Sequence, residues 1–322
     1  MKKIILKKGR EKPVLKKHPW IFSGAIKKVD PGIIDGEIIE LCDHSSGFLA
    51  YGYYNSKSQI SIRLLEWNKD IDINDSWWQE KIKNSISRRD SIIKTDSYRL
   101  IFSEADYLPG LIVDKYGDYL VMQVLTAGIE KVKEIIVNAL LDLTSPSRIF
   151  ERSDSVTRKL EGLEKTSKIL YGDSVPDSII INENNFKFSV NLKEGQKTGF
   201  YLDQRRNREV VSSFSKERRV LDCFSYSGAF SVYSLAHGAE SSTLIDSSKQ
   251  ALDLAKKNLE LNNLSDSIFE LVNEDVFKTL RKFRDCSADF DLIILDPPKL
   301  APTRAQKNKA FRAYKDINLL GM

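Results

Sequence analysis

The feature that most constrains the fold is a strand that ends in an acid and turns into a helix through small residues. The segment Val220–Gly228 reads Val-Leu-Asp-Cys-Phe-Ser-Tyr-Ser-Gly, so that Asp222 lies near the end of an apolar run. A second acid, Asp246, follows further along the chain, and a third, Asp296, precedes two prolines. This order is typical of an open α/β sheet that binds a nucleoside at the carboxyl edge of its strands.

The residues around this segment alternate between strand and helix patterns, which predicts parallel strands joined by right-handed crossovers. We expect strands at 220–223, 242–246, 268–273 and 292–296, and helices at 228–237 and 249–262. The sequence therefore predicts a Rossmann-like α/β domain in the last third of the chain.

The turn after Asp222 suits a cation better than a phosphate. A dinucleotide fingerprint places two or three glycines where backbone amides approach a pyrophosphate, whereas here Phe224 and Ser225 occupy the turn and only Gly228 remains. S-adenosylmethionine has no phosphate and carries a sulfonium and an amino group, which carboxylates attract. We expect Asp246 to accept both ribose hydroxyls of this cofactor.

The first two thirds of the chain show a different organisation. Short strands at 36–42, 48–54 and 59–65, separated by turn residues, predict a small β barrel. A helix from about 77 to 93, strands at 111–114, 119–125 and 148–151, a helix at 129–143 and a hairpin at 179–182 and 186–192 predict a mixed α+β platform. The expected domains are thus 1–70, 71–192 and 193–322.

Basic residues gather at the start of the chain. The net charge is +5, and residues 1–30 contain ten lysines and arginines against only Glu11 and Asp30. Such clustering favours a polyanion, because binding releases its counterions. Trp20 and Phe22 follow directly and can stack on bases.

Composition excludes several other classes. No apolar run has the roughly 20 residues that a membrane span needs, and no secretory signal is evident, so a cytoplasmic location without membrane contact is expected. The three cysteines show no CxxC or histidine pairing, and no metal site is expected. The sequence leaves the oligomeric state open and allows a homodimer.

Four motifs together resemble a known family. His-Pro-Trp-Ile-Phe-Ser-Gly at 18–24, Gly-Tyr-Tyr-Asn at 52–55, Glu-Ala-Asp-Tyr-Leu-Pro-Gly-Leu at 104–111 and Gly-Gln-Lys-Thr-Gly-Phe-Tyr-Leu-Asp-Gln-Arg at 195–205 resemble the PUA-domain-containing ribosomal RNA methyltransferases. Members of that family transfer a methyl group from S-adenosylmethionine to carbon 5 of a cytosine in large-subunit (23S) rRNA. The resemblance covers nearly the whole chain and implies an RNA-binding PUA barrel, a central platform and a class I methyltransferase domain.

The resemblance also implies roles for individual residues. The implied catalytic residues are Asp296, Pro297 and Pro298, a rigid turn that holds a flat base and stabilises charge through its ring nitrogen. The implied cofactor-binding residues are Asp222, Phe224, Ser225, Gly228, Asp246, Asp275, Val276, Phe200 and Gln204. The implied RNA-binding residues are Lys16, Lys17, Trp20 and Arg205.

Carbon 5 of cytosine is a poor nucleophile, and in the family a cysteine thiolate adds to carbon 6. That cysteine follows the strand after 292–296, and we expect it to lie beyond Met322, so that this chain is C-terminally truncated, its α/β domain is incomplete and its own activity is in question. Cys42, Cys223 and Cys286 do not match its position.

Two alternatives stay open. An acid-Pro-Pro turn also suits methylation of a base nitrogen, which needs no thiolate. A non-catalytic RNA-binding protein that keeps the barrel is the second alternative.

Overall fold

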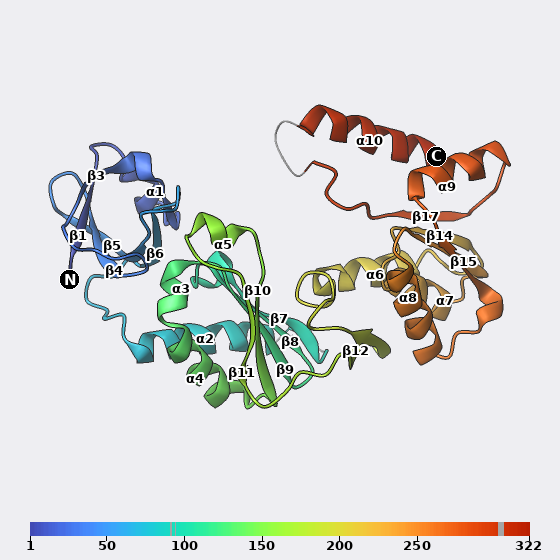
Figure 1. Ribbon diagram of the computed structural model, residues 1–322, viewed down its shortest axis with the longest axis horizontal. Helices are drawn as coiled ribbons and strands as arrows, with labels where there is room; N and C mark the ends of the chain where they lie inside the picture. Colours follow the sequence, from blue (N-terminus) through green and yellow to red (C-terminus); the bar gives the residue numbers. More distant parts are fainter. Residues whose placement is uncertain (91, 94, 302–305) are drawn as a thin grey trace. The chain divides into compact units, whose positions relative to one another are not determined.

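The computed structural model describes residues 1–90, 92–93, 95–301 and 306–322. They divide into two compact units (Figure 1). Unit 1 comprises Met1–Asp177 and Asn191–Phe200, and unit 2 comprises Ser178–Val190 and Tyr201–Met322. The chain thus passes between the units three times.

Unit 1 begins with a six-stranded sheet in the order β2-β6-β5-β4-β1-β3. Its strands are β1 (Lys3–Leu6), β2 (Trp20–Ile21), β3 (Ile26–Val29), β4 (Ile38–Cys42), β5 (Phe48–Tyr54) and β6 (Ile62–Glu66), with the short helix α1 (Lys12–Leu15) after β1. Alternate residues such as Ile4, Leu6 and Ile39 are fully buried in one core. The small β barrel expected from the sequence is confirmed.

The second sheet of unit 1 has the order β11-β10-β9-β8-β7. It consists of β7 (Ser97–Phe102), β8 (Leu111–Tyr116), β9 (Tyr119–Val124), β10 (Arg148–Ser153) and β11 (Thr166–Tyr171), accompanied by α2 (Asp75–Asp90), α3 (Ala127–Lys131), α4 (Lys133–Thr144) and α5 (Thr157–Leu160). Apolar side chains of α2 and α4 pack with those of the sheet in one core. The sequence pattern did not predict β7 or β11, which form the two edges.

Unit 2 contains a four-stranded parallel sheet in the order β16-β15-β14-β17. Its strands are β14 (Arg219–Cys223), β15 (Ser241–Asp246), β16 (Phe269–Asn273) and β17 (Leu292–Leu295), and its helices are α6 (Arg205–Ser212), α7 (Ala229–Ala236), α8 (Lys249–Leu261), α9 (Val276–Asp285) and α10 (Lys307–Leu320). Helices α7 and α8 lie on one side of the sheet and α9 and α10 on the other (Figure 1). This is the α/β fold expected for the last third of the chain.

The strand order reverses at β14. The chain runs outward from β14 to β15 and β16, and then returns to add β17 on the other side of β14. In an open α/β sheet the crevice at such a switch point, outside the carboxyl ends of the strands, is where ligands bind. The carboxyl ends of β14 and β17 are therefore where a ligand is expected to bind.

The hairpin of β12 (Ile179–Glu183) and β13 (Phe186–Val190) belongs to unit 2, whereas the sequence analysis groups it with the platform. The backbone amide of Ser189 donates to the side chain of Asn258 at 2.8 Å, and Phe188 is fully buried. Contacts with α7 and α8 hold the hairpin. The expected boundary at 192/193 thus differs from the division that the contacts give.

Candidate active site

The carboxyl edge of the parallel sheet gathers three acids at two depths. Asp222 on β14 pairs in register with Leu244 of β15 and Ile294 of β17. Asp246 lies two residues beyond Leu244, and Asp296 lies two residues beyond Ile294. Two residues of extended strand correspond to about 7 Å. Asp246 and Asp296 therefore lie at the lip of the sheet, and Asp222 lies beneath it.

Asp222 is almost completely buried, with 1% of its surface exposed. Its Oδ2 accepts a hydrogen bond of 2.8 Å from Ser231 of α7, whose hydroxyl in turn accepts one from Ser242. Burial raises the pKa of Asp222 to about 7, and the negative charges of Asp296 and Asp246 act in the same direction. The three carboxyl groups thus interact electrostatically, as a site for a cation requires.

The turn between β14 and α7 is held in an unusual backbone conformation. Phe224, Tyr226 and Gly228 have φ values of 60°, 46° and 67°. Left-handed backbone costs a non-glycine residue roughly 1–2 kcal/mol, so the surroundings must enforce it. Asn258 does part of this, because its side chain donates to the carbonyl of Ser227 at 2.9 Å.

Three amides of this turn donate to acceptors inside the protein. The N–H of Ser225 donates to the carbonyl of Ile245 at 3.1 Å, that of Tyr226 to Asp246 at 3.0 Å, and that of Gly228 to Ser225 at 2.8 Å. A pyrophosphate would need such donors free and pointing outward. The turn therefore lacks the phosphate cradle of a dinucleotide site, in agreement with the sequence analysis.

Three predicted cofactor residues have structural duties in this turn. Gly228 packs so closely on α8 that an added Cβ would lie 2.8 Å from the Cβ of Ala255. The ring of Phe224 contacts that of Phe277, with 6.4 Å between centroids. Ser225 is 8% exposed and binds the carbonyl of Ile245. The cofactor roles of Phe224, Ser225 and Gly228 stay predictions.

Asp246 keeps acceptor capacity for a ligand. Its Oδ2 accepts from the amide of Tyr226 at 3.0 Å and its Oδ1 from the amide of Ser248 at 2.8 Å. An ionised carboxylate offers about four acceptor sites, so one on each oxygen remains for a pair of hydroxyls. The two amides fix the orientation of the carboxylate.

Asp275 and Val276 begin helix α9. The exposed Asp275 is its N-cap and accepts a hydrogen bond of 2.9 Å from the amide of Lys278. Val276 is buried in the core that α9 shares with the sheet. The predicted adenine contact would therefore use the second oxygen of Asp275, since the first caps the helix.

The Asp296-Pro297-Pro298 turn is linked to helix α6 by side chains. Gln204 donates to Oδ2 of Asp296 at 3.0 Å, and Oε1 of Gln204 accepts a hydrogen bond from Asn207 at 2.5 Å. The structure thus brings Gln204 together with Asp296, both predicted site residues. Asn207 was missed by sequence reasoning, because an exposed asparagine in a short polar helix carries no signal of its own.

A second residue that sequence reasoning missed is Asn258. It lies fully buried on the apolar face of α8, in line with Ala251 and Ala255. It fixes both the 224–228 turn and the β12–β13 hairpin. A polar residue in an apolar helical stripe is a signal that could have identified it.

The remaining predicted residues lie elsewhere. Phe200 belongs to unit 1, where its amide donates to the hydroxyl of Tyr116 at 3.2 Å. Arg205 begins α6, and its charge acts on the buried Glu183. Lys16 and Lys17 are exposed after α1, and Trp20 begins β2. These roles stay predictions.

The described residues suit S-adenosylmethionine. The buried Asp222, the half-buried Asp246 and the exposed Asp296 lie at the switch point, and the turn lacks the phosphate cradle of a dinucleotide site. Among the residues with described positions, no group of histidines, cysteines and acids is arranged to hold a metal ion. In the same stretches no helix has the length and apolar character needed to cross a bilayer.

Comparison with known proteins gives consistent results. A PUA-like domain family matches residues 4–67, and an S-adenosylmethionine-dependent methyltransferase family matches residues 160–315. The crystal structure of SMU.776, a methyltransferase candidate complexed with SAH, aligns with a TM-score of 0.83 at 26% identity, covering 98% of this chain and 83% of that one.

Two curated relatives carry the name ribosomal RNA large subunit methyltransferase I. The protein of Aeromonas salmonicida is 43% identical over 320 residues, covering 98% of this chain and 81% of the relative. That of Vibrio parahaemolyticus is 44% identical over 324 residues, covering 99% and 81%. With this identity along nearly its whole length, the chain belongs to the ribosomal RNA large subunit methyltransferase I family of S-adenosylmethionine-dependent enzymes.

Proposed function

We propose that this protein transfers a methyl group from S-adenosylmethionine to carbon 5 of a cytosine in large-subunit rRNA. The observation that carries the proposal is the Asp296-Pro297-Pro298 turn, fixed by Gln204 at the switch point where Asp222 and Asp246 also lie. The names of the relatives support the RNA substrate.

On the cofactor side, the chain's acids do the binding. When bound, S-adenosylmethionine supplies an electrophilic methyl group. Asp246, oriented by two amides, accepts the ribose hydroxyls, and Asp275 accepts from the adenine amino group. The pKa of Asp222 is raised to about 7, and the positive charge of the bound cofactor favours the ionised form of this carboxyl group.

On the base side, two prolines limit the motion of the turn and remove two N–H donors. A flat base can then lie against the turn while its exocyclic amino group donates to Asp296. Because Gln204, the residue before α6, donates a hydrogen bond to Asp296, the carboxyl group is oriented before the base arrives. Arg205, next to Gln204, would contact the RNA.

Attack through carbon 5 needs a thiolate at carbon 6, and none of the three cysteines is assigned that role. Burial raises the pKa of Cys42 to about 11 and that of Cys223 to about 12, so both stay protonated. Cys286 follows the end of α9, which begins at the carboxyl edge and leads away from it.

The barrel of residues 1–70 is proposed to bind RNA, with 71–192 as a platform and 193–322 as the catalytic domain. Not all of the basic start is available for this. Lys2 pairs with Glu37 at 3.0 Å, and Lys3 with Glu40 at 3.2 Å. The exposed Lys16 and Lys17 are the stronger candidates for phosphate contacts.

The test is nucleoside mass spectrometry of 23S rRNA from cells with and without the gene. We expect deletion to remove one 5-methylcytidine and a plasmid copy to restore it. A methylated base nitrogen lost in its place would support the nitrogen alternative, and unchanged rRNA would support the non-catalytic one. RNA containing 5-fluorocytidine adds a chemical test, since only an enzyme that adds a thiolate to carbon 6 should be trapped covalently on it.

A further inference from the structure

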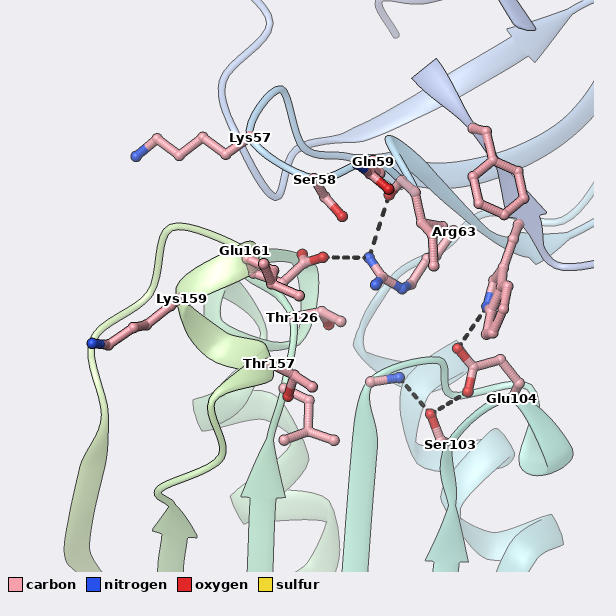
Figure 2. Close-up of a pocket in the computed structure, with 16 residues that line it drawn as sticks. Lys57, Ser58, Gln59, Arg63, Ser103, Glu104, Thr126, Thr157, Lys159 and Glu161 are labelled. Atoms are coloured by element: carbon pink, nitrogen blue, oxygen red, sulfur yellow. Dashed lines mark hydrogen bonds and ion pairs between the residues drawn. The ribbon is translucent and has the colours of Figure 1, made fainter. Parts of the chain in front are cut away.

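Unit 1 contains a cavity of about 740 Å³ that the proposed chemistry does not use (Figure 2). Residues of the loop between β5 and β6, of the segments that follow β7 and β9, and of α5 are among those that line it. Its volume lies within the range of about 300–1,000 Å³ in which proteins bind small molecules and cofactors. It is thus large enough for a nucleotide.

One wall of the cavity is aromatic. Trp20 and Phe22 line it, and Phe22 is 52% exposed. The indole N–H of Trp20 donates to Oε1 of Glu104 at 2.8 Å, while Oε2 of Glu104 accepts from Ser103 at 2.5 Å. These bonds fix the plane of the indole, which favours stacking of a flat ligand.

The deepest charges of the cavity neutralise each other. Arg63 donates to Glu161 at 2.9 Å, and their side chains are only 11% and 3% exposed. The side chain of Asn55 also donates to Glu161, at 2.8 Å. An anionic group therefore gains little from entering this part, whereas an uncharged base can enter it.

Cations lie at the opposite side from the aromatic wall. Figure 2 shows Lys57 and Lys159 on one side of the cavity, and Ser103 with Glu104 on the other. Both lysines are exposed; Lys57 lies in the loop between β5 and β6, and Lys159 lies on α5. A ligand with a flat apolar end and a phosphate would match this distribution.

We propose that this cavity receives one unpaired base of the RNA substrate, distinct from the base that is methylated. The base stacks on Trp20 and Phe22, and its flanking phosphates lie at Lys57 and Lys159. This inference rests on the proposed function, since that function makes RNA the polyanion present. The connected backbone distinguishes RNA from a free nucleotide, which cannot bring two flanking phosphates.

The polar groups near the aromatic wall indicate which bases fit. Glu104 is acceptor-only, and carboxylates accept from exocyclic amino groups such as N4 of cytosine. The exposed amide group of Gln59 can donate a hydrogen bond to an acceptor on a base edge or accept one from a donor. We therefore expect cytosine, adenine or guanine to bind here in preference to uracil.

The test for stacking is a cycle of two proteins and two RNAs, measured by fluorescence anisotropy. A labelled single-stranded RNA 12-mer of mixed sequence is compared with copies that carry one abasic site at each position in turn. We expect one abasic site to weaken binding to the wild type by roughly 5- to 100-fold. Trp20→Ala should lose the same factor on intact RNA and nothing further on the abasic copy. Phe22→Ala, at an exposed position, provides a second variant with less risk to folding.

The test for phosphate contact uses a charge-matched control. Lys57→Glu with Lys159→Glu is compared with Lys83→Glu and Lys168→Glu, two exposed lysines outside the cavity whose reversal changes the net charge equally. The logarithm of the RNA-binding constant falls as the logarithm of the salt concentration rises. We expect the first pair to make this negative slope less steep by about 1.4, as loss of two single-strand phosphate contacts requires. The control pair should change it much less.

Equal RNA affinities for wild type, Trp20→Ala and the Lys57/Lys159 variant would overturn the proposal, and so would a free nucleoside monophosphate that competes as well as RNA. Methylation of 23S rRNA is measured in parallel. Normal methylation by all variants together with unchanged binding refutes the cavity assignment alone. RNA bound through the cavity without any methylated rRNA refutes the proposed function alone.

Discussion

Asp222 combines burial with a proposed role beside a positively charged ligand, and these two features make opposite demands on its ionisation. Its pKa is raised to about 7, so the folded protein binds a proton more tightly than the unfolded chain. In the cofactor-free protein, Asp222 makes its full contribution to the free energy of unfolding below the unfolded pKa of about 4. This contribution is on the order of 4 kcal/mol, and it is lost as the pH rises through about 7.

We predict that Asp222→Asn removes this pH dependence. The variant can still accept the Ser231 hydrogen bond but never ionises. Without cofactor it should be more heat-stable than the wild type at pH 8 and similar at pH 4, as measured by thermal unfolding. In calorimetric titration, the affinity of the wild type for S-adenosylmethionine should fall as the pH is lowered below 7, by up to about tenfold per pH unit, whereas that of the variant should be low throughout.

Two comparisons make this prediction specific. Asp246→Asn should weaken cofactor binding by a similar factor at every pH, because Asp246 acts through hydrogen bonds at the lip. Asp253→Asn, on the exposed side of α8, should change neither property. A variant at Asp222 that follows the wild-type pH profile would contradict the assigned ionisation.

At the scale of the element, the turn between β14 and α7 depends on close packing as well as on backbone conformation. Gly228→Ala is destabilising for two reasons: φ is +67°, which strains a residue with a Cβ, and the new Cβ would lie 2.8 Å from that of Ala255. Only the first reason applies to Gly238→Ala, because φ is +86° and the nearest neighbour, Cγ of Lys216, is 3.6 Å away.

We expect Gly238→Ala to lower the free energy of unfolding by roughly 1–2 kcal/mol, and Gly228→Ala by a further 1–3 kcal/mol from overpacking. Urea unfolding measures both. Only Gly228→Ala should also weaken S-adenosylmethionine binding, because the same turn positions the amide of Tyr226 against Asp246. Equal losses in the two variants would show that packing on α8 is unimportant.

The four parallel strands of unit 2 and its helices α7 and α8 followed from the sequence, because alternating patterns with glycine and acid signals mark the strand ends, whereas α6 and α9 were not predicted. The same patterns missed the edge strands β7 and β11. The residues of β11 are mostly exposed and resemble a loop, whereas β7 is mostly buried but includes the polar Ser97 and Arg99. The position of Asp222 beneath the lip was not predictable either, since spacing gives the order of the acids but not the pairing register. The link from Gln204 to Asp296 required the fold, because the two residues are far apart in sequence and joined only by side chains.

At the scale of the whole molecule, the segment 191–208 is anchored separately in each unit. In unit 1, the hydroxyl of Thr198 donates to Asp114 at 2.6 Å and accepts from Tyr116. In unit 2, Arg208 makes paired hydrogen bonds of 2.9 and 2.8 Å with Glu183. Neither Thr198 nor Arg208 was identified from the sequence, because a threonine or an arginine in a polar motif does not reveal that it is buried.

We predict that Thr198→Val loosens the part of this segment that belongs to unit 1. Loss of the hydroxyl leaves an oxygen of Asp114 and the hydroxyl of Tyr116 with one partner fewer, at a cost of about 1–3 kcal/mol. Limited trypsin digestion should then cut after Lys193 or Lys197 roughly 5- to 100-fold faster.

Thr126→Val is the matched control, because Thr126 is also buried in unit 1 and its hydroxyl accepts from Tyr53 at 2.9 Å. It should lower the stability of unit 1 by a comparable amount without accelerating cleavage at Lys193 or Lys197. Cleavage at the same sites and rates in both variants would mean that the segment opens only when the whole unit unfolds.

The three passages of the chain between the units restrict how this protein can exchange parts with its relatives. A crossover at 177 or at 200 separates residues 191–200 from the partners with which they fold, or the β12–β13 hairpin from the helices that bury it. Hybrids with a homologue should therefore fail when the junction falls between 178 and 200. Recombination between relatives should therefore exchange residues 178–200 only together with the flanking segments on both sides.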